Sequence, residues 1–272
     1  MTDKPILGAA LTFKGITQHR DWLLEKQRDL EIQDLHGAEV LDGDWRPLAE
    51  RLRAALDGHT GRVGLHGPFW GFKIDSHDPE IRAVVRRRLL QGLEACAAVG
   101  ATQMVVHSPY TTWDHSNLDA FPGAREQQIE RVQLTLRDVV ARAESQGCEL
   151  VIENIEDKEP RDRIALAASF GSPAVQVSLD TGHAHYAHVS TGAPPVDVHV
   201  NLAGEALRHV HLQDTDGHAD RHWQPGEGSI RWPGLFAALA RLSGRPRLIL
   251  EVRDQASLRR GAAHLEALGL AE

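Results

Sequence analysis

Leu150-Val151-Ile152-Glu153 is a short apolar run that ends in a carboxylate, and five other runs of the chain end in a metal-binding side chain. These are VGLH at 63–66, MVVH at 104–107, VSLD at 177–180, VH at 210–211 and LILE at 248–251. A carboxylate or imidazole at the end of a buried strand is costly unless it is paired or binds a cation. One such ending is explained by a hydrogen-bonded histidine or a capping acid. Six indicate that the strand ends point at one place, which is most simply a metal site.

The composition is that of a single globular domain over residues 1–272, with 42% hydrophobic and 25% charged residues. The net charge of -8, from 38 acidic and 30 basic side chains, argues against a surface that binds nucleic acid. Cys96 and Cys148 form no disulfide or metal motif, and no apolar run resembles a signal peptide or a membrane span. We therefore expect a cytoplasmic protein that binds no membrane. The sequence leaves its oligomeric state open between a monomer and a homo-oligomer.

Short apolar runs alternate with longer amphipathic stretches along the chain. The predicted strands cover residues 6–11, 34–41, 62–67, 103–108, 149–154, 175–180, 208–214 and 247–252. The predicted helices cover residues 18–30, 46–56, 79–99, 124–146, 161–168, 195–206, 232–242 and 255–268. Strict alternation of strand and helix predicts an α/β fold, the (β/α)8 TIM barrel. A doubly wound open sheet is the competing fold, but it does not bring the ends of six different strands around one centre.

Four of the strand-end residues make the most persuasive metal shell. Glu153, Asp180, His211 and Glu251 offer mixed oxygen and nitrogen ligands that suit manganese, zinc, cobalt or magnesium. For any one of them, an acid paired with arginine or lysine is the alternative interpretation.

The histidines that end the third and fourth predicted strands have two interpretations. His66 and His107 are either hydrogen-bonded residues of the barrel mouth or ligands of a second metal that shares Glu153 as a bridge.

A third group consists of His183, Asp220 and His222. His183 lies three residues beyond Asp180, where it is expected to open the following loop. In an extended segment, Asp220 and His222 direct their side chains to the same side. Three such ligands leave an open position for water or substrate, while a solvated polar loop is the alternative. The remaining histidines are expected in loops or at the surface, with His209 facing away from the barrel centre: His185, His188, His199, His209 and His218.

These residues, in this order, resemble the xylose isomerase-like TIM barrel superfamily, which includes sugar phosphate isomerases/epimerases and the endonuclease IV family. The motifs that carry the resemblance are LHGP at 65–68, VH at 106–107, IEN at 152–154, LDTGH at 179–183, HVHLQD at 209–214, DRH at 220–222, PGEG at 225–228 and LE at 250–251. The resemblance implies that the four strand-end residues match the single-metal shell of ketose 3-epimerases. It also implies that Glu153 and Glu251 are the acid/base pair and that His183 binds substrate.

The chain departs from the epimerase pattern at one substrate-binding position. An arginine is expected six residues after His211, but Gly217 stands there, and Arg221 and Arg253 are the candidates to replace it. The resemblance also matches all nine positions that hold three zinc ions in endonuclease IV: His66, His107, Glu153, Asp180, His183, His211, Asp220, His222 and Glu251. The implied cofactor is therefore zinc or manganese, with one to three ions.

We prefer the hypothesis of a metal-dependent sugar isomerase or epimerase that acts on a small carbohydrate. One glutamate removes the proton next to the carbonyl, a metal-stabilised enediolate forms, and the other glutamate returns the proton. The expected substrate-binding residues are His66, His107, His183, Trp113 and Arg221. The aromatic side chains expected at the mouth, either as an apolar floor for the sugar or as plain loop packing, are Phe69, Trp70, Trp113 and Trp223.

The alternative is a zinc-dependent phosphodiesterase of the endonuclease IV type, which cuts DNA at abasic sites. Such an enzyme needs a basic track for the duplex. The arginine triplet at 86–88 falls in the middle of a predicted helix, on the outer ring, and the loops that would meet DNA are acidic. These features favour the sugar hypothesis. The intact ligand set argues against a third possibility, a metal-binding barrel without activity.

Overall fold

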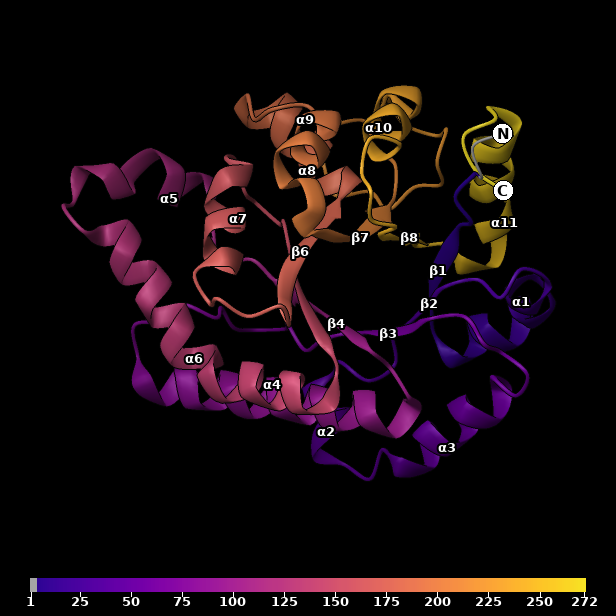
Figure 1. The fold of residues 1–272 in the computed structure, drawn as a ribbon, viewed down its shortest axis with the longest axis horizontal. Coiled ribbons are helices and arrows are strands. Elements are labelled where there is room, and N and C mark those ends of the chain that lie inside the picture. Colours follow the sequence, from indigo (N-terminus) through magenta and orange to yellow (C-terminus); the bar gives the residue numbers. More distant parts are fainter. Residues whose placement is uncertain (1–3) are drawn as a thin grey trace.

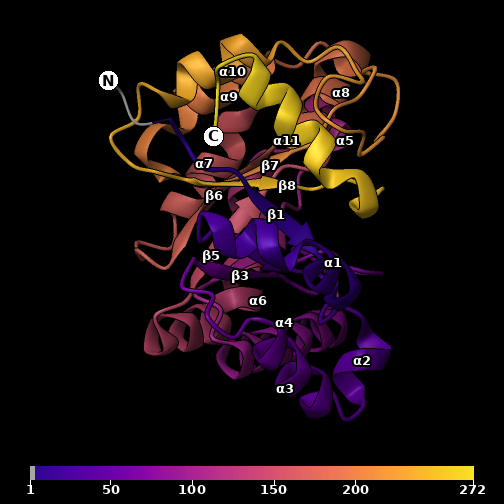
Figure 2. The same cartoon turned by 90° about the vertical axis from the view of Figure 1, so that its right-hand side faces the viewer.

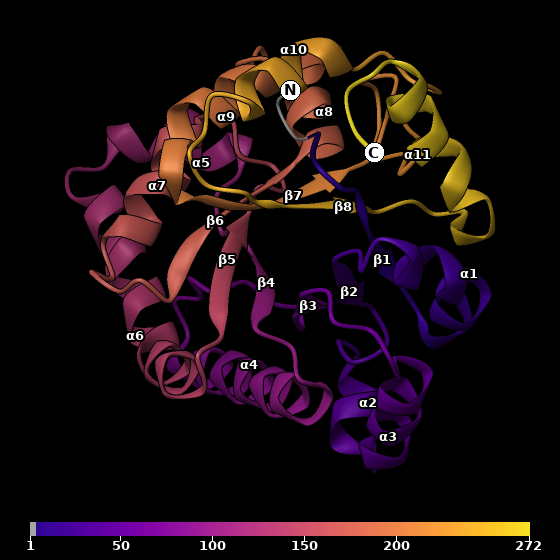
Figure 3. The same cartoon turned by 45° about the vertical axis from the view of Figure 1, so that its right-hand side comes forward.

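The computed structural model describes residues 4–272, so residues 1–3 of the expected domain lie outside the described range. Eight parallel strands form a closed barrel in which each strand pairs with the next and β8 pairs with β1. Figure 3 shows these strands at the centre, surrounded by helices. The strands are β1 (Gly8–Leu11), β2 (Leu30–Ile32), β3 (Val63–His66), β4 (Gln103–His107), β5 (Glu149–Glu153), β6 (Val175–Asp180), β7 (Leu207–Leu212) and β8 (Arg247–Leu250). The predicted (β/α)8 barrel is confirmed.

The helices form an outer layer around the barrel. In Figures 1 and 2, α2–α4 and α6 lie on one side of the strands and α8–α11 on the other. The helices are α1 (Phe13–Glu25), α2 (Ala38–Asp42), α3 (Arg46–Ala55), α4 (Pro79–Val99), α5 (Thr112–Asn117), α6 (Ala124–Gln146), α7 (Pro160–Ala168), α8 (Thr181–Thr191), α9 (Val196–Ala203), α10 (Trp232–Leu239) and α11 (Leu258–Ala267). Among residues 4–272, no helix is both long enough and apolar enough to cross a lipid bilayer.

Helix α4 shows how local sequence sets the element boundaries. Asp78 caps its first turn by accepting a hydrogen bond from the Glu80 amide, and Pro79 occupies the first helical position. Gly100 ends the helix with a φ of 74°, which favours glycine. The predicted limits of α4, at 79–99, and of α6, at 124–146, are confirmed. A Cβ on Gly92 would lie 2.9 Å from Met104 Sδ and from the rigid ring of Pro68, so glycine favours the close packing of α4 on the barrel.

The second predicted strand is wrong, and the first predicted helix exists with different limits. The strand is the three-residue segment Leu30–Ile32, and most of the predicted strand at 34–41 forms a loop and the start of α2. The charged Glu31 interrupts the apolar pattern of β2, which hides the strand in the sequence. Helix α1 correspondingly covers Phe13–Glu25 rather than 18–30, and helices α2, α5 and α8 were not predicted.

Polar side chains occupy part of the barrel interior, where branched apolar residues usually dominate. His209 on β7 approaches Glu31 on β2, although these strands are not neighbours. Arg247 on β8 donates to Thr102 beside β4. The prediction that His209 faces away from the centre is therefore wrong, because residues two apart on a strand share a face and His211 also points inward.

Candidate functional site

The first donor group surrounds His211 at the carboxyl end of the barrel. Nδ1 of His211 lies 2.7 Å from Oε1 of Glu153, 3.3 Å from Oε2 of Glu251 and 4.0 Å from Oδ2 of Asp180. The four side chains come from β5, β6, β7 and the residue after β8, and all four are buried. Their donor atoms lie within 4.8 Å of one another. The strand ends therefore do converge on one place.

A second donor group shares Glu153 with the first. Oε2 of Glu153 lies 3.5 Å from Nε2 of His107 and 3.9 Å from Nε2 of His66. The two imidazole nitrogens are 3.4 Å apart. The two oxygens of Glu153 therefore face different groups of donors, which is the arrangement of a bridging carboxylate.

The third donor group lies beside the first on the outer side of the barrel mouth. Oδ1 of Asp220 is 3.4 Å from Nε2 of His183 and 3.1 Å from Nε2 of His222. Nδ1 of His222 is 3.6 Å from Oε2 of Glu251. All nine predicted metal ligands thus lie in three adjoining groups.

The donor atoms have the properties that a divalent cation requires. Glu153 Oε2 and Asp180 Oδ2 are buried, and neither has a hydrogen-bond partner among residues 4–272. Unpaired carboxylate oxygens in a protein interior are strongly unfavourable without a compensating cation. A shell of carboxylates and imidazoles fits zinc or manganese.

Three of the histidines are also oriented for metal binding. Nδ1 of His66, His183 and His222 faces the backbone oxygen of Gly67, Asn154 and Glu251 respectively, at 2.9–3.2 Å. A carbonyl accepts only from a protonated nitrogen, so each contact fixes the proton on Nδ1. In the neutral ring the lone pair then lies on Nε2, the nitrogen that would bind an ion.

Gln213 connects the first and third groups and was not predicted from the sequence. Its Nε2 donates to Oδ1 of Asp180 at 3.1 Å and to Oδ1 of Asp220 at 3.0 Å, and its Oε1 accepts from the amide of His222. A Cβ on Gly182 would lie 2.2 Å from the Gln213 amide carbon, so glycine is needed for this packing. Gln213 stands two residues after His211 on the same strand face, which is the one signal in the sequence that pointed to it.

Gln33 supports Glu251 from the end of β2. Its Nε2 donates to Oε1 of Glu251 at 2.7 Å, and Gln255 donates to its Oε1 at 3.2 Å. Oε1 of Gln255 in turn accepts from the amide and hydroxyl of Thr12. One oxygen of Glu251 is thereby held, and the other faces His211 and His222. The long sequence separation of these residues hides the network from sequence analysis.

The loop between β7 and α10 carries Asp220 and His222, and the buried Asp214 anchors it. Its carboxylate accepts from the amides of Thr215, Gly226 and Ile230 at 2.8–3.2 Å and from the Trp232 indole at 3.1 Å. This explains the PGEG motif structurally, because the turn at Gly226 wraps around the Asp214 carboxylate.

Replacing Asp214 with alanine is expected to lower the free energy of unfolding by about 3–5 kcal/mol, because four buried donors lose their acceptor. Urea denaturation measures this change, and zinc affinity of the third donor group should fall with it. Asp216→Ala is the control, since this neighbour is more exposed and pairs with Arg221 and turn groups. Equal stability of both variants would contradict the anchoring role.

The protonation of the donors differs from group to group. Burial lowers the pKa of His107 to about 3, so this ring is neutral at pH 7. Burial also acts to lower the pKa of His222, but its hydrogen bond to Asp220 and the charge of Glu251 raise this pKa to about 9. Burial raises the pKa of Asp180 to about 6. Burial likewise acts to raise the pKa of Glu153, yet the neighbouring His211 and His107 hold it below its ordinary value.

Metal binding to the third donor group is therefore expected to strengthen as the pH rises towards 9. A protonated His222 must lose its proton to bind an ion, so each displaced proton gives about a tenfold gain in affinity per pH unit below its pKa. Zinc titration against a competing chelator between pH 6.5 and 8.5 measures this slope. His222→Gln should make this slope shallower. If the slope is unchanged in this variant, the released proton does not come from His222.

The aromatic mouth is smaller than the sequence suggested. Phe69 stacks on His107, with ring centroids 4.3 Å apart, and packs edge-on against His66. Trp70 and Trp113 are 68% and 62% exposed. Trp113, an expected substrate contact, lies on α5 and does not line the cavity beside His107. Arg221 is held by Asp216 and lies over Trp223, with 5.3 Å between the guanidinium carbon and the ring centroid.

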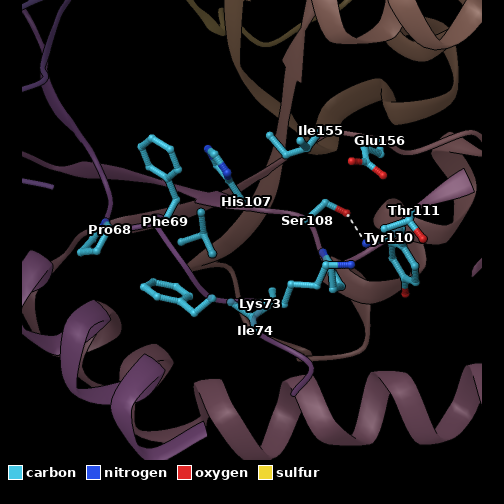
Figure 4. A pocket seen from close by; sticks show the side chains of 13 residues that line it. Pro68, Phe69, Lys73, Ile74, His107, Ser108, Tyr110, Thr111, Ile155 and Glu156 are labelled. Atoms are coloured by element: carbon cyan, nitrogen blue, oxygen red, sulfur yellow. Dashed lines mark hydrogen bonds between the residues drawn. The ribbon is translucent and has the colours of Figure 1, made fainter. Parts of the chain in front are cut away.

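A cavity of about 140 Å³ adjoins the second donor group. Figure 4 shows Phe69 and His107 at one end, with Lys73, Tyr110 and Thr111 farther along. Its remaining wall is formed by Pro68, Phe72, Ile74, Val106, Ser108, Pro109, Ile155 and Glu156. The cavity thus combines apolar walls with hydroxyl groups, next to candidate metal ligands.

Three further predictions about histidines need correction. His183 does not lie in a loop but in the first turn of α8, where its amide donates to the capping Asp180 carboxylate at 2.7 Å. The segment of His222 is not extended there, since this residue has a φ of 50°. His199 is buried on α9 rather than exposed.

A closed parallel barrel with acidic and imidazole side chains at its carboxyl end defines the class of the protein as a TIM barrel with a candidate metal centre. Residues 28–268 match the family described as xylose isomerase-like TIM barrel, and the chain belongs to this family.

Several solved structures share the fold. The TTHB071 protein from Thermus thermophilus, soaked with ZnCl2, is 27% identical, with a TM-score of 0.71, over 96% of this chain and 97% of that one. The 3-keto-D-glucoside 4-epimerase from E. coli is 19% identical, with a TM-score of 0.71, over 97% of this chain and 100% of that one. A D-psicose 3-epimerase structure obtained in the presence of D-fructose is 16% identical, with a TM-score of 0.70, over 98% of this chain and 100% of that one.

Proposed function

We propose that the protein is a divalent-metal-dependent isomerase or epimerase that acts on a sugar or sugar derivative by proton transfer next to a carbonyl. The observation that carries this proposal is the placement of Glu153 and Glu251, which approach the same atom of His211 from strands on different sides of the barrel. The epimerase structures with the same fold support the substrate class. Zinc and manganese are the metals that best fit the donors.

Each residue then has a defined task. Glu153, Asp180, His211 and Glu251 hold an ion, which when bound supplies a Lewis acid for negative charge on substrate oxygens. One glutamate removes the proton from the carbon next to the carbonyl, and the other returns a proton to the opposite face or to the neighbouring carbon. The neighbouring histidines hold the pKa of Glu153 below its ordinary value, so this carboxylate is ionised at neutral pH and can hold an ion or accept a proton.

The mouth residues bind the rest of the sugar. Phe69 offers an apolar surface beside His107, and the hydroxyl groups of the cavity next to it would face sugar hydroxyls. Of the expected substrate contacts, His66, His107 and His183 belong to the donor groups, beside the proposed ion. Arg221 can serve only after leaving Asp216.

A second candidate is the phosphodiesterase at abasic sites in DNA, which the three adjoining donor groups favour. The surface argues against it. The arginine triplet lies on α4, where Arg86 pairs with Asp138 and Arg88 pairs with Asp42 on the outer ring. The net charge of -8 also disfavours the basic track that a duplex needs.

One experiment separates these functions. The protein is loaded with zinc or with manganese and incubated with a panel of ketoses in deuterated water, while a parallel assay uses a duplex with one abasic site. We expect at least one divalent metal per chain by elemental analysis and exchange of the proton next to the ketone, lost with a chelator and restored by metal. Cleavage of the duplex at low enzyme concentration, without exchange on any ketose, would overturn the proposal in favour of the second candidate.

A further inference from the structure

A buried acidic residue lies directly beneath the first donor group. Glu31, in the middle of β2, is 2% exposed and faces the barrel interior. Both of its oxygens lie 3.1 Å from Nε2 of His211. Neither the sequence motifs nor the three donor groups of the mouth account for this residue.

The contact with Glu31 determines which nitrogen of the His211 ring carries a proton. A carboxylate accepts a hydrogen bond, so Nε2 must carry a proton, and in the neutral ring the lone pair then lies on Nδ1. Nδ1 is the atom that faces Glu153, Asp180 and Glu251. When an ion takes the place of a proton at Nδ1, Glu31 therefore stabilises the tautomer that binds it, with the remaining proton on Nε2.

A second histidine holds Glu31 in place. Nε2 of His209 lies 3.1 Å from Oε2 of Glu31, in a close contact with poor hydrogen-bond alignment. Nδ1 of His209 is 2.8 Å from the hydroxyl of Ser178 on β6. The result is a continuous polar chain through the barrel interior that reaches His211: Ser178, His209, Glu31 and His211.

This series of polar contacts lowers the stability of the folded state. Placing an ionised carboxylate and two imidazoles inside a barrel sacrifices the apolar packing that usually fills it. In His66, His183 and His222, the nitrogen that points away from the donor group, Nδ1, faces a backbone oxygen. In His211 the corresponding nitrogen is Nε2, and it faces the carboxylate of Glu31. A charged acceptor makes the ring a stronger electron donor than a neutral carbonyl does.

We propose that Glu31 is a positioning residue that orients His211 and raises its affinity for the metal, with His209 and Ser178 holding Glu31 in place. This inference rests on the proposed metal centre. It assigns a function to a part of the barrel interior that touches neither substrate nor ion. Glu31 acts through His211, so its loss should weaken metal binding without removing a ligand.

The test compares Glu31→Leu and Glu31→Gln with the matched variant Gln103→Leu. Gln103 is also buried inside the barrel, on β4, and donates to Glu149 at 3.1 Å without touching a donor group. Leucine removes the acceptor, while glutamine keeps one acceptor oxygen of the same shape. Circular dichroism and thermal melting of the metal-free proteins establish that each variant is folded.

Zinc affinity of the intact protein is measured by competition with a chelator. We expect Glu31→Leu to lower the affinity of the tightest site by about 10- to 100-fold. Glu31→Gln should lie between this variant and the wild type, and Gln103→Leu should match the wild type. In the zinc-bound wild type, NMR should find the Nε2 proton of His211 far downfield and slow to exchange. This signal should move upfield or vanish in Glu31→Leu.

The outcomes separate this inference from the proposed function. Folded Glu31 variants with wild-type zinc affinity and an unchanged His211 proton signal would overturn the positioning role, whatever the substrate is. Weakened binding in Gln103→Leu to the same extent would do so too, because the effect would then be general destabilisation. Absence of zinc binding by the wild type would overturn both proposals. If the wild type binds zinc and the Glu31 variants bind it more weakly as expected, but no ketose shows proton exchange, only the proposed sugar chemistry would be contradicted.

Discussion

Replacing Glu153 with alanine is expected to remove metal from the first and second donor groups together and to reduce turnover by about 10³-fold or more. The reason is that its two oxygens face different groups, with Oε1 near His211 and Oε2 near His107. Metal content by elemental analysis and kcat on the responsive ketose measure the two effects. The third donor group does not include Glu153 and should retain its ion.

The control is Glu149→Ala, which changes the same residue type on the same strand. Glu149 begins β5 at the opposite end of the barrel and accepts from Gln103. This variant should keep the wild-type metal content and turnover. Retention of full metal content by Glu153→Ala would show that the first and second groups are not metal sites.

Glu251→Gln is the second change with a large expected effect. Glutamine has the same shape and can still accept from Gln33 at the Oε1 position, so the fold should survive with little change in melting temperature. It cannot take up a proton as a base, and it is a weaker ligand than a carboxylate. We expect turnover to fall by about 10²- to 10⁴-fold.

The measurement for Glu251→Gln is kcat at saturating metal, which separates proton transfer from metal loss. Glu266→Gln on α11, a residue outside every donor group, serves as the control for loss of one acidic charge. Survival of normal turnover in Glu251→Gln would remove this residue from the acid/base pair and leave Asp180 or Glu153 to be tested next.

The barrel was predictable because its signals are local and repeated. Alternation of strands and helices, the cap at Asp78 and the glycine ends of α4 and α6 each depend on a few neighbouring residues. Strand β2 escaped because it has three residues, with an acid in the middle. Helix α8 escaped because its polar, histidine-rich sequence has almost no apolar face, although Asp180 and the His183 amide form a normal helix cap.

The convergence of the nine candidate donor residues was predictable, but the residues that contact and orient them were not. Nine donors stand at strand ends or in the segments that follow, so position along the chain was enough to find them. Glu31, Gln33 and Gln213 matter because of contacts with residues 180, 218 and 33 positions away. Only the closed barrel brings such residues together. The prediction for His209 was wrong because residues that are two positions apart on a strand, such as His209 and His211, face the same side.

The shared carboxylate of Glu153 also links the occupancies of the first two donor groups. An ion on one side would withdraw electron density from the oxygen that faces the other side, and two cations held by one carboxylate repel each other. Their binding would therefore be anticooperative, and the effect of each ion on the other would be equal, as thermodynamic linkage demands. Loading of the barrel would then proceed in steps set by the free metal concentration.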